Sequence, residues 1–196
     1  TLVEFNQVPE FIVVGITNVE SKRMQTFSAG AKDFLTYLDQ EVLHYVDTHY
    51  RTSNKRLLFG WAYGGGFALE TLLAQPNLFD GYILASPYPV SSKIKRLETF
   101  LSKNKQLSSS LYFSSDSKEF GVKEGTEDLS KLLTTSTNKL RWDFRVLEGE
   151  EHRSTPYATL YHGIKNYFKY YTELTFKSLD EYTKKGGMRY INEYYN

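Results

Sequence analysis

The sequence has no cysteine, no long apolar run and almost no net charge in its 196 residues. The absence of cysteine excludes disulfides, thiolate metal sites and a cysteine nucleophile. No run approaches the roughly 18 consecutive apolar residues that a membrane span requires, so we expect no transmembrane segment. The 24 basic residues balance the 23 acidic ones, and the net charge of +1 creates no general attraction to nucleic acid or an anionic membrane. We therefore expect no nucleic-acid partner.

The sequence also contains no H-E-x-x-H motif or comparable ligand cluster. We therefore expect neither a metal nor another cofactor. What the chain does have is 40% hydrophobic and 24% charged residues, a composition typical of globular proteins. Its length suits one domain with a substantial core.

Five short apolar or β-branched runs are typical of buried strands. They are Phe11–Ile16, Leu57–Phe59, Tyr82–Ala85, Leu111–Phe113 and Trp142–Leu147. Between the first two runs, apolar residues recur every three or four positions from Phe34 to Val46, which predicts an amphipathic helix ending near Tyr50. Helical patterns also occupy 65–74, 93–101, 124–133 and the region after Pro156. The alternation predicts an α/β fold with a mostly parallel sheet flanked by helices, and ligands at the carboxyl ends of its strands.

A glycine-rich turn follows the second of these predicted strands. It reads Gly60-Trp61-Ala62-Tyr63-Gly64-Gly65-Gly66, with the spacing G-x-A-x-G-G. Glycines two residues before and two residues after a central position suit a nucleophile elbow, because side chains there would strike the adjacent strand and helix. A phosphate-binding turn is the alternative, but the segment has no Walker lysine and no G-x-G-x-x-G spacing.

From this turn outward the chain resembles the Putative esterase family of α/β-hydrolases, which includes siderophore esterases and esterase D-like enzymes. The resemblance extends over about Val8 to Phe168. It is carried by the elbow together with Pro9–Asn18, Tyr50–Thr52, Phe79–Ile83, Ser86-Pro87 and Gly149–Pro156. The family elbow has serine where this chain has Ala62. The resemblance implies an α/β-hydrolase domain, the carboxyl-side portion of that fold, whose opening strands would lie before Thr1.

We place this domain at residues 1–172. Residues 173–196 contain Gly186-Gly187 between two amphipathic stretches, which predicts a helical extension at the carboxyl end. Without the opening strands the sheet would have an exposed edge, which invites pairing with another chain. A homo-oligomer is therefore left open, and the sequence does not indicate a compartment.

An acyl-transfer site needs a base beside the nucleophile and a carboxylate that orients the base. Among the four histidines, His152 follows the last predicted strand by a short loop, and the chain order nucleophile, acid, histidine is the one expected of this fold. The acid should follow the strand Leu111–Ser114, where Asp116, Glu119 and Glu124 are all within reach. The resemblance, in which the acid closes a G-x-x-E or G-x-x-D pattern, favours Glu119, and Asp116 is the alternative.

The oxyanion hole should use the backbone N–H of Tyr63, which follows the nucleophile position at the start of a helix. The resemblance places the second donor in a loop before Thr1. The residues expected to border the substrate pocket are Trp61, Asn18, Arg23 and Ser86. Trp61 either lines an acyl or aryl pocket or packs against the neighbouring helix, and Arg23 either meets an anionic group or is merely exposed.

The implied function is a serine esterase that hydrolyses a small-molecule carboxylic ester through an acyl-enzyme. Loss of the nucleophile of such a triad costs on the order of 10⁶ in rate, so the chain with Ala62 should be inactive. An engineered serine-to-alanine change is the favoured explanation of Ala62. The alternative is a natural pseudoenzyme that serves as a ligand-binding or protein-interaction module.

Overall fold

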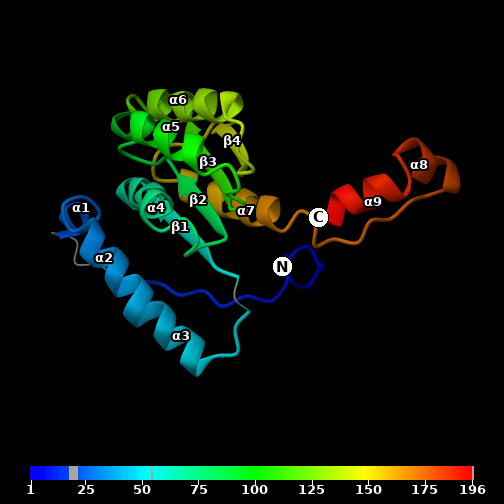
Figure 1. Cartoon of the computed structure of the whole chain (residues 1–196), viewed down its shortest axis with the longest axis horizontal. Coiled ribbons are helices and arrows are strands. Elements are labelled where there is room, and N and C mark those ends of the chain that lie inside the picture. The colour runs from blue at the N-terminus through cyan, green and yellow to red at the C-terminus, as the bar shows by residue number, and fades with distance from the viewer. Residues whose placement is uncertain (18–21, 54, 196) are drawn as a thin grey trace. The chain divides into compact units, whose positions relative to one another are not determined.

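The computed structural model describes residues 1–17, 22–53 and 55–195 of the chain. The chain forms two compact units, Gly15–Gly163 and the combination of Thr1–Val14 with Ile164–Asn196. The larger unit contains the sheet (Figure 1). Within the described ranges, no helix is both long enough and apolar enough to span a bilayer.

The sheet of the larger unit has four parallel strands in the order β1-β2-β3-β4. They are β1 (Leu57–Trp61), β2 (Gly81–Ala85), β3 (Ser110–Asp116) and β4 (Arg141–Leu147). The register pairs Trp61 with Ala85, Ala85 with Ser114, and Ser114 with Arg145. Because the strands are parallel, the loops that follow them all leave from one edge of the sheet.

Helices of the larger unit follow the predicted alternation with the strands. They are α1 (Arg23–Thr26), α2 (Ala31–Tyr37), the π-helical η2 (Leu38–Leu43), α3 (His44–His49), α4 (Tyr63–Ala74), the 3₁₀ turn η3 (Ser91–Lys93), α5 (Ile94–Lys103), α6 (Val122–Thr135) and α7 (Thr155–Tyr167), the last of which continues past Gly163. The stretch from α2 to α3 is the long amphipathic helix predicted from the sequence. Its residues Leu35 and Leu38 are buried in a cluster with Phe67 of α4. The α/β fold with a parallel sheet and flanking helices is confirmed.

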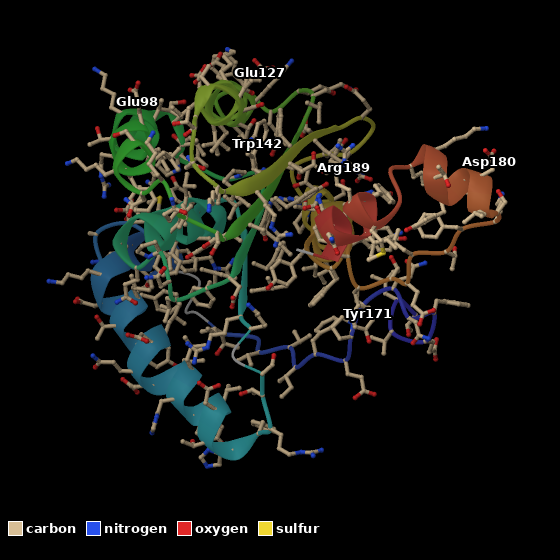
Figure 2. All side chains as sticks on the ribbon, turned by 45° about the vertical axis from the view of Figure 1, so that its right-hand side comes forward. Glu98, Glu127, Trp142, Tyr171, Asp180 and Arg189 are labelled. Atoms are coloured by element: carbon tan, nitrogen blue, oxygen red, sulfur yellow. The ribbon has the colours of Figure 1, made fainter. Side chains whose placement is uncertain are left out.

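The main core lies between one face of the sheet and helices α4, α5 and α6; α5 and α6 lie together on one side of the strands (Figure 1). Its fully buried members include Leu69, Leu72, Leu84, Leu97, Phe113 and Leu129. Burial of each such side chain contributes about 1.5–3 kcal/mol. The polar side chain of Glu98 lies on the outer side of α5 (Figure 2). Because successive strand residues face opposite ways, Ile83 points from β2 toward Gly163 of α7 on the other face.

The predicted first strand, Phe11–Ile16, is wrong. Residues 11–17 have no regular secondary structure, and Val13 is 78% exposed. A strand requires a neighbouring backbone that pairs with its N–H and C=O groups, and no described segment provides one here. The apolar composition of a segment predicts what it can bury but not whether a partner strand is present.

Residues 173–196, predicted as a helical extension, contain α8 (Leu179–Lys184) and α9 (Met188–Tyr195). Ser178 caps α8, because its hydroxyl oxygen accepts a hydrogen bond of 3.1 Å from the backbone N–H of Glu181. The division of the chain at residue 172 stays a prediction.

Candidate active site

The connection between β1 and α4 is a sharp turn made by a single residue, Ala62. Its backbone has φ 51° and ψ −117°, a strained conformation for a residue other than glycine. Three backbone hydrogen bonds hold it there. Its N–H donates to Ala85 O at 3.0 Å, and its carbonyl accepts from Gly66 N at 3.0 Å and from Tyr88 N at 2.9 Å. This is the strand-to-helix turn that the glycine spacing predicts.

The glycines around Ala62 are required by close approach of the backbone. A Cβ at Gly60 would collide with the backbone of Gly64, and a Cβ at Gly66 would collide with the carbonyl of Tyr88. The sequence predicts that both flanking positions exclude side chains, but the structure differs at Gly64. A Cβ there would meet only the ring of Phe27, at an ordinary contact distance of 3.9 Å. At this close approach the residue that must be glycine is therefore Gly60, which lies against the backbone of Gly64.

The loops after β3 and β4 bring a carboxylate and an imidazole together. Nδ1 of His152 is hydrogen-bonded to Oε1 of Glu119. The other carboxylate oxygen, Oε2, accepts from Ser86 Oγ at 2.6 Å and from Asp116 N at 3.0 Å. The side chain of Glu119 is 7% exposed and that of His152 is 44% exposed. A buried carboxylate on Nδ1 fixes the orientation of the ring and leaves Nε2 as the nitrogen that can exchange a proton with a reactant.

Trp61 places this pair beside the elbow. Its indole Nε1 donates to the backbone carbonyl of His152 at 3.0 Å, and the two ring centroids lie 5.0 Å apart. Trp61 immediately precedes Ala62, so His152 lies next to the turn. From the sequence, Trp61 either lines the substrate pocket or packs against the neighbouring helix. In the structure it holds the histidine loop, and a role in contacting substrate stays a prediction.

Comparison with known proteins gives the family of this chain. The family model described as Putative esterase matches residues 1–175. This chain belongs to the Putative esterase family. The family assignment confirms the resemblance found in the sequence.

Curated relatives of this esterase-family chain are named as siderophore esterases. The ferri-bacillibactin esterase BesA of Bacillus subtilis is 27% identical over 136 residues, which are 64% of this chain and 47% of BesA. The siderophore enterobactin esterase of Emericella nidulans is 43% identical over 61 residues, which are 30% of this chain and 20% of that protein. This chain therefore spans about half or less of the length of the curated relatives it matches.

The fold of this esterase-family chain also occurs in solved structures. The crystal structure of the BES protein from Bacillus cereus matches with a TM-score of 0.69 at 24% identity, over 84% of this chain and 72% of that one. Likeness at this level of identity concerns the fold. The predicted α/β-hydrolase class is confirmed.

Asp116, the alternative acid in this family member, occupies a different place from Glu119. Its carboxylate oxygen Oδ1 accepts from the backbone N–H of Lys118, and its side chain is almost fully buried. Asp116 thus shapes the turn after β3, and its own backbone N–H supports Glu119. Of the two candidates, Glu119 is the one bonded to His152.

Three other predicted site residues are Tyr63, Arg23 and Asn18. Tyr63 is the first residue of α4, so its backbone N–H has no partner within the helix. Arg23 begins α1, is exposed, and precedes by one turn Phe27, which lies near the elbow. Asn18 lies outside the described residues. The roles of these residues in binding or catalysis stay predictions.

Ser86 differs from its predicted position at the rim of the pocket. It is fully buried, and its hydroxyl points to Glu119 and to Thr155 rather than outward. Thr155 itself is missing from the sequence-based site. It begins α7, is fully buried, and its Oγ1 lies 3.1 Å from the carbonyl oxygen of His152. The signal that could have identified it is a hydroxyl residue just before Pro156, at a helix start that closely follows the candidate base.

Proposed function

We propose that this chain carries the elbow, base and acid of a serine esterase, with Ala62 at the position of the nucleophile. The observation that carries the proposal is the His152–Glu119 pair beside a strained strand-to-helix turn. The same three parts, in the order nucleophile, acid and base along the chain, serve acyl transfer in α/β-hydrolases. Membership of the Putative esterase family supports ester hydrolysis as the reaction.

In the form with serine at position 62, the serine Oγ attacks the ester carbonyl carbon while His152 Nε2 accepts the serine proton. The negative charge that develops on the carbonyl oxygen faces the backbone N–H of Tyr63 at the positive end of α4. His152 then returns the proton to the departing alkoxide, which leaves as an alcohol. A water molecule releases the acyl group by the same steps. Glu119 holds the imidazole and stabilises its charged form throughout.

The substrate class that we propose is a siderophore-type ester with an aromatic group. The names of the curated relatives support a siderophore ester. Aromatic side chains near position 62 support an aromatic group: Trp61 lies against His152, and the rings of Tyr63 and Tyr88 meet edge to face at 5.5 Å. Tyr88 is 42% exposed, so its ring is accessible to a ligand. Aromatic faces and edges bind planar rings through stacking and edge contacts.

Ala62 itself favours a second candidate function, in which the pocket binds the ester without turnover. A methyl group cannot attack a carbonyl, whereas the remaining groups of the site are retained. Loss of the nucleophile leaves binding and oxyanion stabilisation in place.

The variant Ala62→Ser separates the two candidates. We expect the serine form to hydrolyse p-nitrophenyl acetate and to react with a fluorophosphonate label, and both activities to vanish in Ala62→Ser/His152→Ala. His49→Ala is a matched control, because His49 is an exposed histidine whose Nδ1 lies 2.9 Å from the carbonyl oxygen of Tyr45. It should leave both activities unchanged.

A serine form that is inert toward ester and label, but binds a catecholate siderophore ester in a calorimetric titration, would support the binding function instead. A serine form that neither reacts nor binds would contradict both candidates.

A further inference from the structure

Two buried hydroxyl groups form a hydrogen-bonded chain with the carboxylate of the His152–Glu119 pair. They belong to Ser86, which directly follows β2, and to Thr155, the first residue of α7, and both residues are fully buried. Ser86 Oγ lies 2.6 Å from Glu119 Oε2 and 2.8 Å from Thr155 Oγ1. We propose that Ser86 is a positioning residue, which fixes one oxygen of Glu119 so that the other is presented to His152. The inference rests on the esterase function proposed above.

The direction of these hydrogen bonds follows from the groups involved. A carboxylate oxygen only accepts, so Ser86 must donate its single hydroxyl proton to Glu119. The contact between Ser86 and Thr155 then requires Thr155 to donate to Ser86. The carbonyl oxygen of His152 has two lone pairs and lies within reach of both the indole N–H of Trp61 and the Thr155 hydroxyl, so the Thr155 proton is shared between this carbonyl and Ser86 Oγ. The resulting chain runs from Thr155 through Ser86 to the carboxylate that holds His152.

The backbone of Ser86 indicates that its hydroxyl is needed. Ser86 has φ 42°, a left-handed conformation that glycine adopts at lower cost than any L-residue with a side chain. Its N–H donates to Ser114 O at 2.8 Å and so extends the pairing of β2 with β3. Strain of this kind persists where the surroundings enforce it, and it is concentrated at functional sites. A glycine here would relieve the strain but could not donate to Glu119.

A second buried hydroxyl pair offers a structural control. Ser114 Oγ of β3 lies 2.5 Å from Thr159 Oγ1 of α7, and both residues are fully buried. This pair joins the sheet to the same helix as Ser86 and Thr155 do, but no hydrogen bond links it to Glu119. If Ser86 served only for packing, removal of the Ser86 hydroxyl and removal of the Ser114 hydroxyl would have the same effect on activity.

The kinetic test uses Ser86→Gly, Ser86→Ala and Ser114→Ala, each in the Ala62→Ser protein with p-nitrophenyl acetate. Both Ser86 variants should lower kcat about 10- to 100-fold with KM unchanged, because a hydrogen bond to a charged group is lost. Ser114→Ala should leave kcat unchanged. Ser86→Gly relieves the left-handed strain, so it guards against failure to fold. Full kcat in Ser86→Gly, or equal losses in Ser86→Ala and Ser114→Ala, would overturn the positioning role.

A spectroscopic test in the chain with Ala62 does not depend on catalysis. The Nδ1 proton that His152 shares with Glu119 should give a downfield proton NMR resonance, assigned by its loss in His152→Ala. Ser86→Gly should shift or broaden this resonance, and Ser114→Ala should leave it in place. An unchanged resonance in Ser86→Gly overturns the positioning role, whether or not the serine form is active. An inert serine form with the expected resonance shift contradicts the esterase proposal and supports the contact of Ser86 with Glu119.

Discussion

Glu119→Gln is the sharpest perturbation of the proposed triad, because it replaces one carboxylate oxygen by an NH₂ group of similar size. In the structure Oε2 accepts from two donors, Ser86 Oγ at 2.6 Å and Asp116 N at 3.0 Å, while Oε1 faces Nδ1 of His152. A glutamine amide has one oxygen that accepts and one nitrogen that donates. Its oxygen must take the place of Oε2, since an NH₂ group there would face the fixed backbone N–H of Asp116.

The NH₂ group of the glutamine then faces His152 Nδ1 and forces that nitrogen to act as an acceptor. The imidazole proton moves to Nε2, so the ring cannot accept a proton from a serine at position 62. The corresponding tautomer error in a serine protease lowers kcat about 10⁴-fold. We therefore expect Glu119→Gln in the Ala62→Ser protein to lose about 10⁴ in kcat, equivalent to about 5 kcal/mol of transition-state stabilisation, with little change in KM.

The assay compares saturation kinetics of p-nitrophenyl acetate hydrolysis for Glu119→Gln and Asp116→Asn in the Ala62→Ser protein. Asp116→Asn tests the alternative acid. Its side-chain oxygen can still accept from Lys118 N, so kcat should stay close to that of the parent. The reasoning is refuted if Glu119→Gln keeps more than about a tenth of the parent kcat, or if Asp116→Asn shows the larger loss.

Two further predictions concern stability. In Gly163→Ala a Cβ on α7 would lie 2.5 Å from Cγ2 and 3.0 Å from Cγ1 of Ile83, so urea denaturation should show that the free energy of unfolding falls by about 1–3 kcal/mol. Gly15→Ala is the control, because a Cβ there would have nothing within 4 Å and its free energy of unfolding should not fall. Equal losses in the two variants would contradict the packing argument. The buried hydroxyl of Tyr112 has no hydrogen-bond partner among the described residues, and burial raises the pKa of Tyr112 from its usual 10 to about 12. Because this pKa is higher in the folded than in the unfolded chain, the unfolded chain ionises first and stability falls as pH rises from about 10 to 12. Tyr112→Phe should reduce that fall by about 2–3 kcal/mol, while the raised pKa of Tyr82 maintains a further part of it; an identical pH dependence in both proteins would contradict the assignment.

The sheet could be predicted from the sequence because its inner strands are buried on both faces. All residues of β2 and β3 are buried, so apart from Asp116 at the end of β3 these strands appear as continuous runs of apolar or small residues. The same criterion failed for Phe11–Ile16, where the run is apolar but no described strand pairs with it. Burial of a strand can be predicted from its apolar composition, whereas its pairing depends on a partner strand that the composition does not reveal.

The elbow could be predicted from a steric requirement, whereas the acid is favoured in the sequence by the family resemblance alone. At Gly60 a side chain would strike the backbone, as the spacing predicts, whereas the other predicted position, Gly64, has room for one and the second steric requirement lies at Gly66. Asp116 and Glu119 carry the same functional group three positions apart, and nothing in their identity selects one. The choice is made by the turn after β3, in which Asp116 bends back to the N–H of Lys118 and leaves Glu119 to face the next loop.

The contacts of His152 depend on the order of the strands. Neighbouring strands lie about 4.8 Å apart, so the ends of β1 and β4 are separated by roughly 14 Å, three such steps. His152 follows β4 yet is bonded to Trp61 at the end of β1. The loop after β4 must therefore cross the ends of β3 and β2. Ser86 directly follows the end of β2, Glu119 follows the end of β3 by three residues, and the two side chains are hydrogen-bonded to each other. Glu119 is bonded to the His152 ring and Ser86 is bonded to Glu119, and this arrangement cannot be recognised until the strand order is known.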